Sequence, residues 1–395
     1  MPSPNHPTWT YSLPAALLLM APFDLLASLA MDVYLPAVPV MPDALDTSPA
    51  VVQLTLSLYM VTLGVGQIVF GPISDRIGRR PVLLAGAITF AAASFLLAGA
   101  SSAAAFLAFR FLQAAGASAA LVATFATVRD VYAERPEGAT IYSVFSSMLA
   151  FVPALGPIAG ALIADRWGWR AIFATLGLLA GAATLNALVR WHESRPPAGA
   201  PSRIAFAPIL RSPAFQTYTL GFSAAMGSFF VFFSTAPRVL MERAGFSELE
   251  FSLAFATAAI AMIVTTRFAK RFVETWGIAG SLANGMGMLL LGAAFLSAGE
   301  LTASPSFMSF VMPMWIVSVG IVFAASVTAN GALREFGETA GTAVALYFCV
   351  QSLIVGIVGT AFVLLLPGGT AWPLAGYSSI MALATLAALR RLEAQ

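Results

Sequence analysis

Long apolar stretches alternate with short polar ones along nearly the whole chain. Each apolar stretch has about 20 residues, the length that a helix needs to cross about 30 Å of hydrocarbon. Helices of this length bond their own backbone groups inside a bilayer, and the stretches lack the alternation of a membrane β-strand. The pattern therefore predicts an all-α integral membrane protein with twelve spans. The expected spans are 13–35, 50–70, 82–100, 104–127, 139–163, 170–190, 214–236, 250–268, 279–298, 307–331, 341–366 and 371–389.

A polar segment rich in proline interrupts this pattern between the sixth and seventh spans. Such a composition is typical of a linker. We expect an N-terminal six-helix bundle over 1–190, a cytoplasmic linker over 191–213 and a C-terminal six-helix bundle over 214–395. The charged loop 71–81 after span two has a weaker counterpart at 266–277 after span eight, which favours an internal duplication.

The amino-acid composition excludes a soluble fold. The chain is 59% hydrophobic and 10% charged, whereas soluble domains have about 45–50% apolar and about 25% charged residues. The single cysteine, Cys349, excludes an intrachain disulfide and a thiolate metal cluster. No nucleophile motif or metal-ligand spacing is present, and both histidines lie in polar terminal or linker sequence. We therefore expect no enzymatic activity, no cofactor and no metal.

The basic residues predict the orientation in the membrane. Most of the 20 Lys and Arg residues fall in the loops on the side of the two termini, so the positive-inside rule places both termini in the cytoplasm. The segment before the first span has no basic region typical of a removable signal peptide. A net charge of +2, divided among many loops, does not indicate nucleic-acid binding. The expected partners are lipid and a small molecule, and the expected state is a monomer.

Three ionisable residues fall within predicted spans. Asp24 lies near the middle of span one, and Ser28 follows it on the same helical face. Arg110 lies about seven residues into span four, where a guanidinium must face a cavity or a carboxylate. We expect an Asp24–Arg110 pair, which would either be purely structural or carry protons or substrate. Asp32, near the outer end of span one, is either an exposed interfacial acid or a second functional acid.

Two further motifs occur in the N-terminal half of the sequence. The loop after span two is a tight, charged turn, for which topological anchoring is one reading and a conformational latch the other. Its residues are Gly71, Asp75, Arg76, Gly78 and Arg79, with Arg129 and Asp130 as expected partners of Asp75. Span five contains prolines and closely spaced glycines, which kink a helix and allow a neighbouring helix to approach. These residues are Pro153, Gly156, Pro157 and Gly160.

Together these motifs resemble the major facilitator superfamily. The loop after span two is similar to its GxxxDRxGRR signature, and span four to its RxxQGxGA motif, with Ala114 in place of the first glycine. The span-one string DxYLPAxP, which begins at Asp32, and the span-five glycines resemble motifs of its twelve-span drug:proton antiporters, with Ala161 in place of the last span-five glycine. The resemblance implies two pseudo-symmetric six-helix bundles, alternating access, a latch at the charged loop and export rather than uptake.

Longer strings in spans one, four, seven and ten narrow the resemblance to the bacterial phenicol exporters. It implies proton-driven efflux of chloramphenicol and florfenicol across the bacterial inner membrane, with Asp24 and Arg110 as the matched span-one acid and span-four arginine. A broad-specificity multidrug:proton antiporter and a proton-coupled solute symporter remain the alternatives. A small neutral drug with an aromatic ring would need aromatic faces and a few polar groups. The candidates at suitable depth are Ser28, Tyr34, Gln53, Tyr59, Phe229, Phe233, Trp315, Asn330 and Tyr347.

Overall fold

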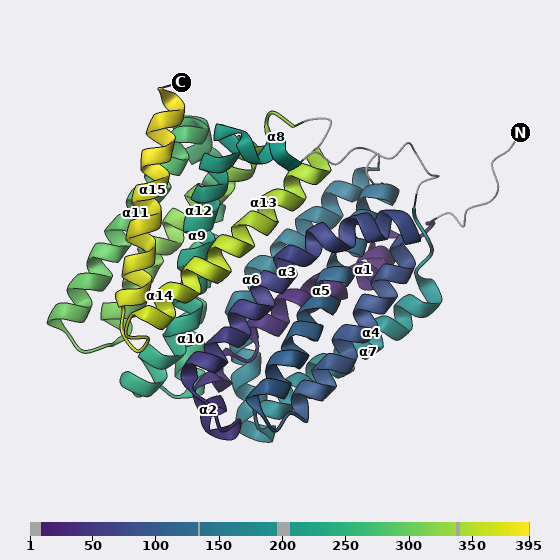
Figure 1. Ribbon diagram of the computed structural model, residues 1–395, viewed down its shortest axis with the longest axis horizontal. Coiled ribbons are helices and arrows are strands. Elements are labelled where there is room, and N and C mark those ends of the chain that lie inside the picture. Colours follow the sequence, from purple (N-terminus) through teal and green to yellow (C-terminus); the bar gives the residue numbers. More distant parts are fainter. Residues whose placement is uncertain (1–8, 133–134, 196–205, 337–339, 395) are drawn as a thin grey trace, which may run out of the picture.

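The computed structural model describes residues 9–132, 135–195, 206–336 and 340–394, which fold into packed helices (Figure 1). We call the described residues up to 195 the N-terminal half and those from 206 the C-terminal half. The N-terminal half contains α1 (Leu13–Asp32), the 3-10 helix η1 (Leu35–Val40), α2 (Met41–Ala44), α3 (Pro49–Ile77), α4 (Arg79–Ala98), α5 (Ala103–Tyr132), α6 (Pro136–Trp167) and α7 (Trp169–Arg190).

The C-terminal half repeats this order of long helices, with three π-helical turns inserted. It contains α8 (Phe206–Arg211), α9 (Pro213–Pro237), η2 (Arg238–Arg243), α10 (Glu248–Thr266), α11 (Ala269–Thr302), η3 (Phe307–Val311), α12 (Met312–Leu333), α13 (Ala340–Ile354), η4 (Val355–Gly359), α14 (Thr360–Leu365) and α15 (Trp372–Glu393). Figure 1 shows the two halves side by side, the N-terminal half from purple to teal and the C-terminal half from teal to yellow.

The helices have the length and composition of membrane spans. Among the described residues, eleven helical segments are long and apolar enough to cross a membrane. The remaining expected span, 139–163, lies within the continuous helix α6. Figure 1 shows α8 and the end of α15 at one end of the molecule, and α2 at the opposite end. The predicted all-α membrane fold is confirmed.

Three predicted spans differ from the expected continuous helix. The first ends as an α-helix at Asp32 and continues as η1, where Pro36 and Pro39 lack the N–H that an α-helix needs. The tenth begins as the π-helical turn η3 and becomes an α-helix only at Met312. The eleventh is divided into α13 and α14 by the π-helical turn η4. Local backbone chemistry of this kind is not visible in hydropathy alone.

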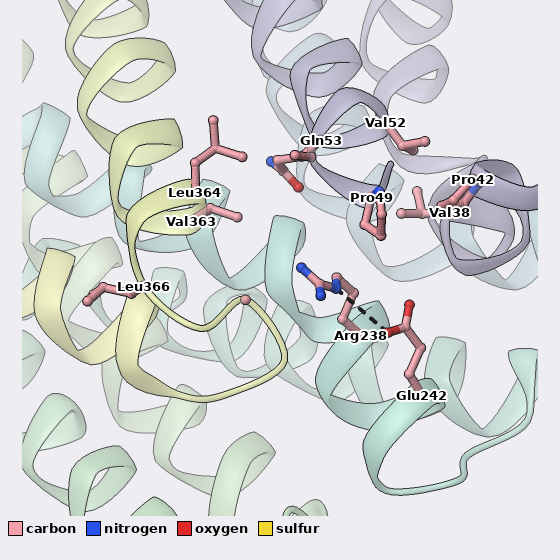
Figure 2. Close-up of a pocket in the computed structure, with 12 residues that line it drawn as sticks. Val38, Pro42, Pro49, Val52, Gln53, Arg238, Glu242, Val363, Leu364 and Leu366 are labelled. Atoms are coloured by element: carbon pink, nitrogen blue, oxygen red, sulfur yellow. Dashed lines mark ion pairs between the residues drawn. The ribbon is translucent and has the colours of Figure 1, made fainter. Parts of the chain in front are cut away.

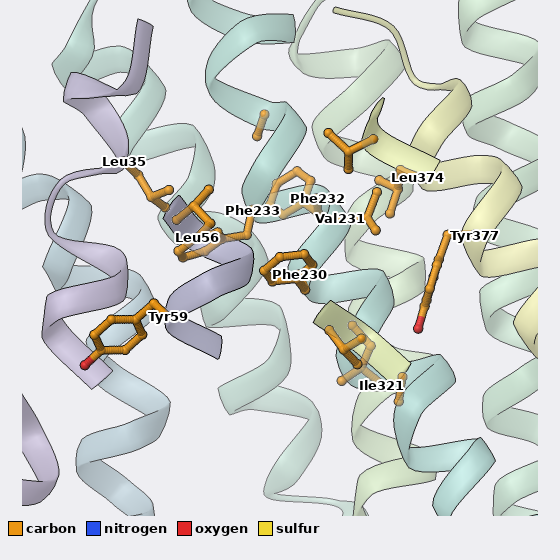
Figure 3. Packing of buried hydrophobic residues seen from close by; sticks show 14 of the residues in the cluster. Leu35, Leu56, Tyr59, Phe230, Val231, Phe232, Phe233, Ile321, Leu374 and Tyr377 are labelled. Carbon is orange, nitrogen blue, oxygen red and sulfur yellow. The ribbon is translucent and has the colours of Figure 1, made fainter. Parts of the chain in front are cut away.

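The two halves contact each other along two helix pairs, α3 with α13 and α6 with α10. Small residues allow the close approach: a Cβ at Gly64 would overlap a side chain of α13. The hydroxyl of Ser57 on α3 bonds that of Thr360 at the start of α14, and Ser252 Oγ donates to the Pro157 carbonyl at 3.0 Å across the α6–α10 pair. Apolar residues from both halves also share one buried cluster (Figure 3).

Candidate functional site

The guanidinium of Arg110 is fully buried in α5 between two tyrosine rings. Its Cζ lies 4.7 Å from the ring centroid of Tyr34 and 4.4 Å from that of Tyr59. Its Nη1 donates to the Ala30 carbonyl at 3.2 Å and to Gln113 Oε1 at 2.6 Å. Cation–π contacts and neutral acceptors lower the cost of burying this charge but do not neutralise it. The site therefore favours the approach of an anionic or acceptor group.

Arg110 also retains unused hydrogen-bonding capacity. Its Nε and Nη2 are buried without a hydrogen-bond partner within the described part of the chain. Gln113 is fixed by donating from Nε2 to Ser94 Oγ at 2.8 Å, so its carbonyl oxygen faces Arg110. Two free guanidinium donors can bind a carboxylate or the oxygens of a polar ligand.

Asp24 lies on α1 at a different level from Arg110. Its side chain is buried, and its Oδ2 has no hydrogen-bond partner among the described residues. Arg110 reaches the carbonyl of Ala30, six residues further along α1, which is about 9 Å along a helix axis. The predicted Asp24–Arg110 ion pair is therefore wrong for this conformation. Asp24 is a buried acid without a basic partner in the described ion pairs.

Asp32 is enclosed by the packing of α1 against α6. Only 6% of the residue is exposed, so the reading of Asp32 as an exposed interfacial acid is wrong. A Cβ at Gly156 would lie 3.0 Å from the Cβ of Asp32, and one at Gly160 would lie 1.7 Å from the carbonyl oxygen of Val33. The span-five glycines thus allow α6 to cover Asp32. Because Ala30 contacts Arg110, Asp32 lies closer in sequence than Asp24 to the arginine's contact on α1.

The charged loop after span two forms a network that differs from the expected one. Arg79 is buried and bonds Asp75 at 2.5 Å and Asp130 at 2.8 Å, while Arg129 pairs with Asp130 at 3.3 Å. The expected Asp75–Arg129 partnership is wrong, because Arg79, the first residue of α4, bonds Asp75 and bridges it to Asp130 on α5. The glycine at 78 has a φ of +111°, which permits the sharp turn from α3 into α4.

The remaining loop candidates lie at the surface of this network. Arg76 is exposed and its carbonyl accepts a hydrogen bond from Arg195, which ties the loop to the chain that follows α7. A Cβ at Gly71 would meet open space, so its environment does not require glycine. Their predicted role in a latch remains a prediction.

Glu193, just after α7, contacts the start of α4, and the sequence does not predict this contact. Its carboxylate accepts hydrogen bonds from the backbone N–H groups of Arg79 at 2.8 Å, Arg80 at 3.2 Å, Ser194 and Arg195. Burial acts to raise the pKa of Glu193, but these donors outweigh it and hold the pKa below its ordinary value. Glu193 thus caps α4, whose preceding glycine has no side chain for the purpose. No local sequence signal reveals a cap so distant in the chain.

Two predicted pocket residues, Tyr34 and Tyr59, lie together at Arg110. Their hydroxyls bond Thr55 Oγ1 at 3.0 Å and the Ala27 carbonyl at 2.7 Å, respectively, which fixes both rings against the guanidinium. The rings are fully buried. Aromatic faces, a cation and free donors therefore occur at one place.

The structure does not bring the other pocket candidates to Arg110. Phe229 and Phe233 on α9 pack against Phe255, and Tyr347 donates to Thr328 Oγ1 at 2.9 Å. Trp315 donates to Thr257 Oγ1 at 2.9 Å. Asn330 is exposed and Ser28 is half-buried. Phe229, Phe233, Trp315 and Tyr347 thus make separate contacts within the C-terminal half. The predicted drug contacts of all six residues remain predictions.

Gln53 lines a groove between the halves, at the same end of the molecule as α2 (Figure 2). We call this space the interhalf groove. Its apolar walls come from both halves, and its polar side chains come from α3 and η2. The apolar lining includes Val38, Pro49, Val52, Val363 and Leu364. The polar lining residues are Gln53, Arg238 and Glu242.

This chain belongs to the Major Facilitator Superfamily, whose family model matches residues 23–388. The predicted family membership is confirmed, and the chain is a membrane transporter of that superfamily. It is 52% identical to a chloramphenicol resistance protein of Pseudomonas aeruginosa, with 96% of this chain and 91% of that protein covered. It is also 30% identical to the multidrug resistance protein MdtL of Salmonella paratyphi A, with 81% and 80% covered.

Solved structures confirm the fold. The chain is similar to a POT family transporter in complex with 5-aminolevulinic acid, with a TM-score of 0.74, 13% identity and coverage of 97% and 95% of the two chains. It is similar to the nucleoside transporter NupG, with a TM-score of 0.72, 15% identity and coverage of 96% and 99%. At such low identity the similarity extends to the fold alone.

Proposed function

We propose that this protein exports phenicol antibiotics such as chloramphenicol and florfenicol across the bacterial inner membrane in exchange for protons. The observation that carries the proposal is the 52% identity over 96% of the chain to a chloramphenicol resistance protein. The protein works as a monomer with both termini in the cytoplasm, needs no cofactor and is driven by the proton gradient. The excess of basic residues in the loops on the side of the termini supports this orientation.

Arg110 is the centre of the proposed mechanism. Its buried charge is uncompensated by an ion pair within the described residues, and its Nε and Nη2 are free to donate. A drug with amide, hydroxyl or nitro oxygens can accept from these donors while its ring lies beside Tyr34 or Tyr59. Drug binding from the cytoplasmic side therefore satisfies groups that are otherwise buried without partners.

Asp24 and Asp32 are the proposed proton carriers. Both are buried on α1, on either side of the Ala30 carbonyl that Arg110 contacts. A deprotonated carboxylate attracts Arg110, whereas a proton from outside removes that attraction. Small displacements of α1 against α5 would thus differ in energy between the two protonation states. Coupling follows because drug and carboxylate compete for the same guanidinium.

The test is drug efflux from everted membrane vesicles that contain the full chain, with and without a protonophore. We expect chloramphenicol transport that a protonophore abolishes. Asp24→Asn and Asp32→Asn should each abolish pH-gradient-driven transport while the protein still inserts at wild-type amounts. Asp165→Asn, the same change at an exposed acid near the end of α6, is the matched control and should retain proton-driven transport. Unchanged pH-driven efflux in both aspartate variants would contradict the assignment.

A broad-specificity multidrug antiporter is the second candidate, supported by the 30% identity to MdtL. Growth inhibition with chloramphenicol, florfenicol and ethidium separates the two. Protonophore-sensitive resistance to the phenicols alone supports the narrow exporter, and resistance to ethidium as well supports the multidrug pump. Drug accumulation inside the cells in place of resistance would favour a symporter.

A further inference from the structure

The interhalf groove has features of a ligand site that the central residues do not explain. Gln53 is 5% exposed, yet its Nε2 has no hydrogen-bond partner among the described residues. The Nε of Arg238 is likewise buried without a hydrogen bond. The Glu242 carboxylate lies 3.7 Å from that nitrogen, which is an ion pair but too long for a hydrogen bond. Two unsatisfied donors thus line one space.

Both side chains reach into the groove, while the Nε of Arg238 faces Glu242. Figure 2 shows the Gln53 amide and the Arg238 guanidinium directed into the same space, from α3 and from η2. A Cβ at Gly368 would lie 2.4 Å from Arg238 Nη1, so the loop after α14 packs closely against the guanidinium. Arg238 is therefore held in place on the groove's C-terminal-half side.

The remaining lining defines the chemistry of the occupant. Val52, Val363 and Leu364 supply apolar walls. The charges of Arg238 and Glu242 cancel, so the groove has no net attraction for a cation or an anion. A neutral molecule with an apolar ring and hydrogen-bond acceptors fits this combination of walls and donors.

The groove's position relates it to transport. It lies between the halves at the end where α2 is found, opposite α8 and the end of α15. If the termini face the cytoplasm, a drug moving outward between the halves must pass this place. We propose that the interhalf groove is a release site, in which Gln53 and Arg238 donate hydrogen bonds to the exported neutral drug. This inference rests on the proposed function.

The experiment uses a cysteine reporter in the full chain. Ala50, exposed at the start of α3, lines the groove, and Ala303, exposed after α11, lies outside it. The variants Ala50→Cys and Ala303→Cys are made in a Cys349→Ala background that has first been shown to export chloramphenicol. The proteins are placed in nanodiscs, and the rate of labelling by a charged maleimide is measured against chloramphenicol concentration.

We expect chloramphenicol to slow labelling of Ala50→Cys and to leave Ala303→Cys unchanged. Adding Gln53→Leu or Arg238→Gln should raise the half-protecting concentration about fivefold or more, as loss of one hydrogen bond predicts. Two variants are used so that misfolding of one leaves the other as the test, and each is first checked for monodispersity. A half-protecting concentration that stays unchanged in the folded Gln53→Leu and Arg238→Gln variants would overturn the proposal.

Two further outcomes separate this proposal from the proposed function. Absence of protection at Ala50→Cys in a background that exports chloramphenicol overturns the release site alone. A wild-type chain that does not export chloramphenicol at all overturns the proposed function instead. Equal protection at Ala50→Cys and Ala303→Cys would indicate a global conformational response and also overturns the release site.

Discussion

The two halves of the molecule share one helix packing but differ in charge. In the N-terminal half a Cβ at Gly116 of α5 would lie 2.6 Å from the Gly86 carbonyl oxygen of α4. In the C-terminal half a Cβ at Gly320 of α12 would lie at the same distance from the Gly285 carbonyl oxygen of α11. Equivalent helix pairs therefore cross at equivalent glycines, which supports the internal duplication.

This correspondence shows where the halves diverge. Arg110 lies six residues before Gly116, and Met314 lies six residues before Gly320. Both side chains are fully buried, so one half carries a cation where the other carries a thioether. The four charged residues that are buried in the described part of the chain all belong to the N-terminal half. They are Asp24, Asp32, Arg79 and Arg110.

This difference in buried charge indicates that the two halves have different roles in transport. Buried polar residues of the C-terminal half are hydroxyls and amides, many of which bond their own helix, as Ser228 and Thr235 do. Such hydroxyl and amide groups respond little to the arrival or loss of a proton. We infer that proton coupling resides in the N-terminal half and that the C-terminal half supplies apolar surface against which it moves.

The largest expected effect comes from replacing Arg110 with methionine, the residue found at the equivalent position 314 of the C-terminal half. Arg110→Met should reduce chloramphenicol resistance to that of cells without the protein, because the only buried guanidinium in α5 is lost while the volume is nearly kept. Resistance is measured as the minimal inhibitory concentration at matched expression.

Met314→Leu is the matched control in the C-terminal half. It should leave resistance near the wild-type value, because a thioether is replaced by a hydrocarbon of similar volume. If Arg110→Met retained resistance, or if Met314→Leu removed it, the inference that proton coupling resides in the N-terminal half would be wrong.

A second effect tests the shared packing. Gly116→Ala and Gly320→Ala should each destabilise the protein by about 1–3 kcal/mol, because each new methyl group meets a backbone carbonyl of the facing helix. The measurement is the thermal unfolding midpoint of the purified protein in detergent. The two shifts should be similar, since the two contacts have the same geometry.

Gly181→Ala in α7 and Gly287→Ala in α11 are the controls. A Cβ at either position meets no atom within 4 Å, so both variants should keep or slightly raise the midpoint. A large drop in only one of the two contact variants would indicate that the crossings are not equivalent.

The sequence predicts the helices well because crossing a membrane requires about 20 apolar residues, and that requirement is local. It also predicts which side chains are unusual, since Asp24 and Arg110 stand out in apolar surroundings. The sequence does not predict which residues these side chains contact. Arg110 contacts tyrosines and a carbonyl rather than Asp24, because the rise along α1 separates them. Asp32 is buried because α6 covers it, which depends on tertiary packing.

The smallest expected effect concerns the cap on α4, for which the C-terminal half offers a comparison. Glu193 follows the last long helix of the N-terminal half, and Glu393 ends the last helix of the C-terminal half, where it is exposed. Glu193→Gln should speed hydrogen exchange of the Arg79 and Arg80 amides about fivefold near neutral pH, as loss of an N-cap predicts. Glu393→Gln should leave exchange at the start of α4 unchanged.

The effect should depend on pH in a defined direction. The pKa of Glu193 lies below its ordinary value of 4.5 in the folded protein, because backbone N–H groups bond the ionised carboxylate despite its burial. Its contribution to stability is therefore present above about pH 4.5 and is lost as the pH falls through the folded pKa. Exchange of the Arg79 and Arg80 amides in the wild-type protein and in Glu193→Gln should differ near pH 7 and converge in acid. A ratio of exchange rates that stays constant from pH 7 into acid would show that the carboxylate charge does not hold the start of α4.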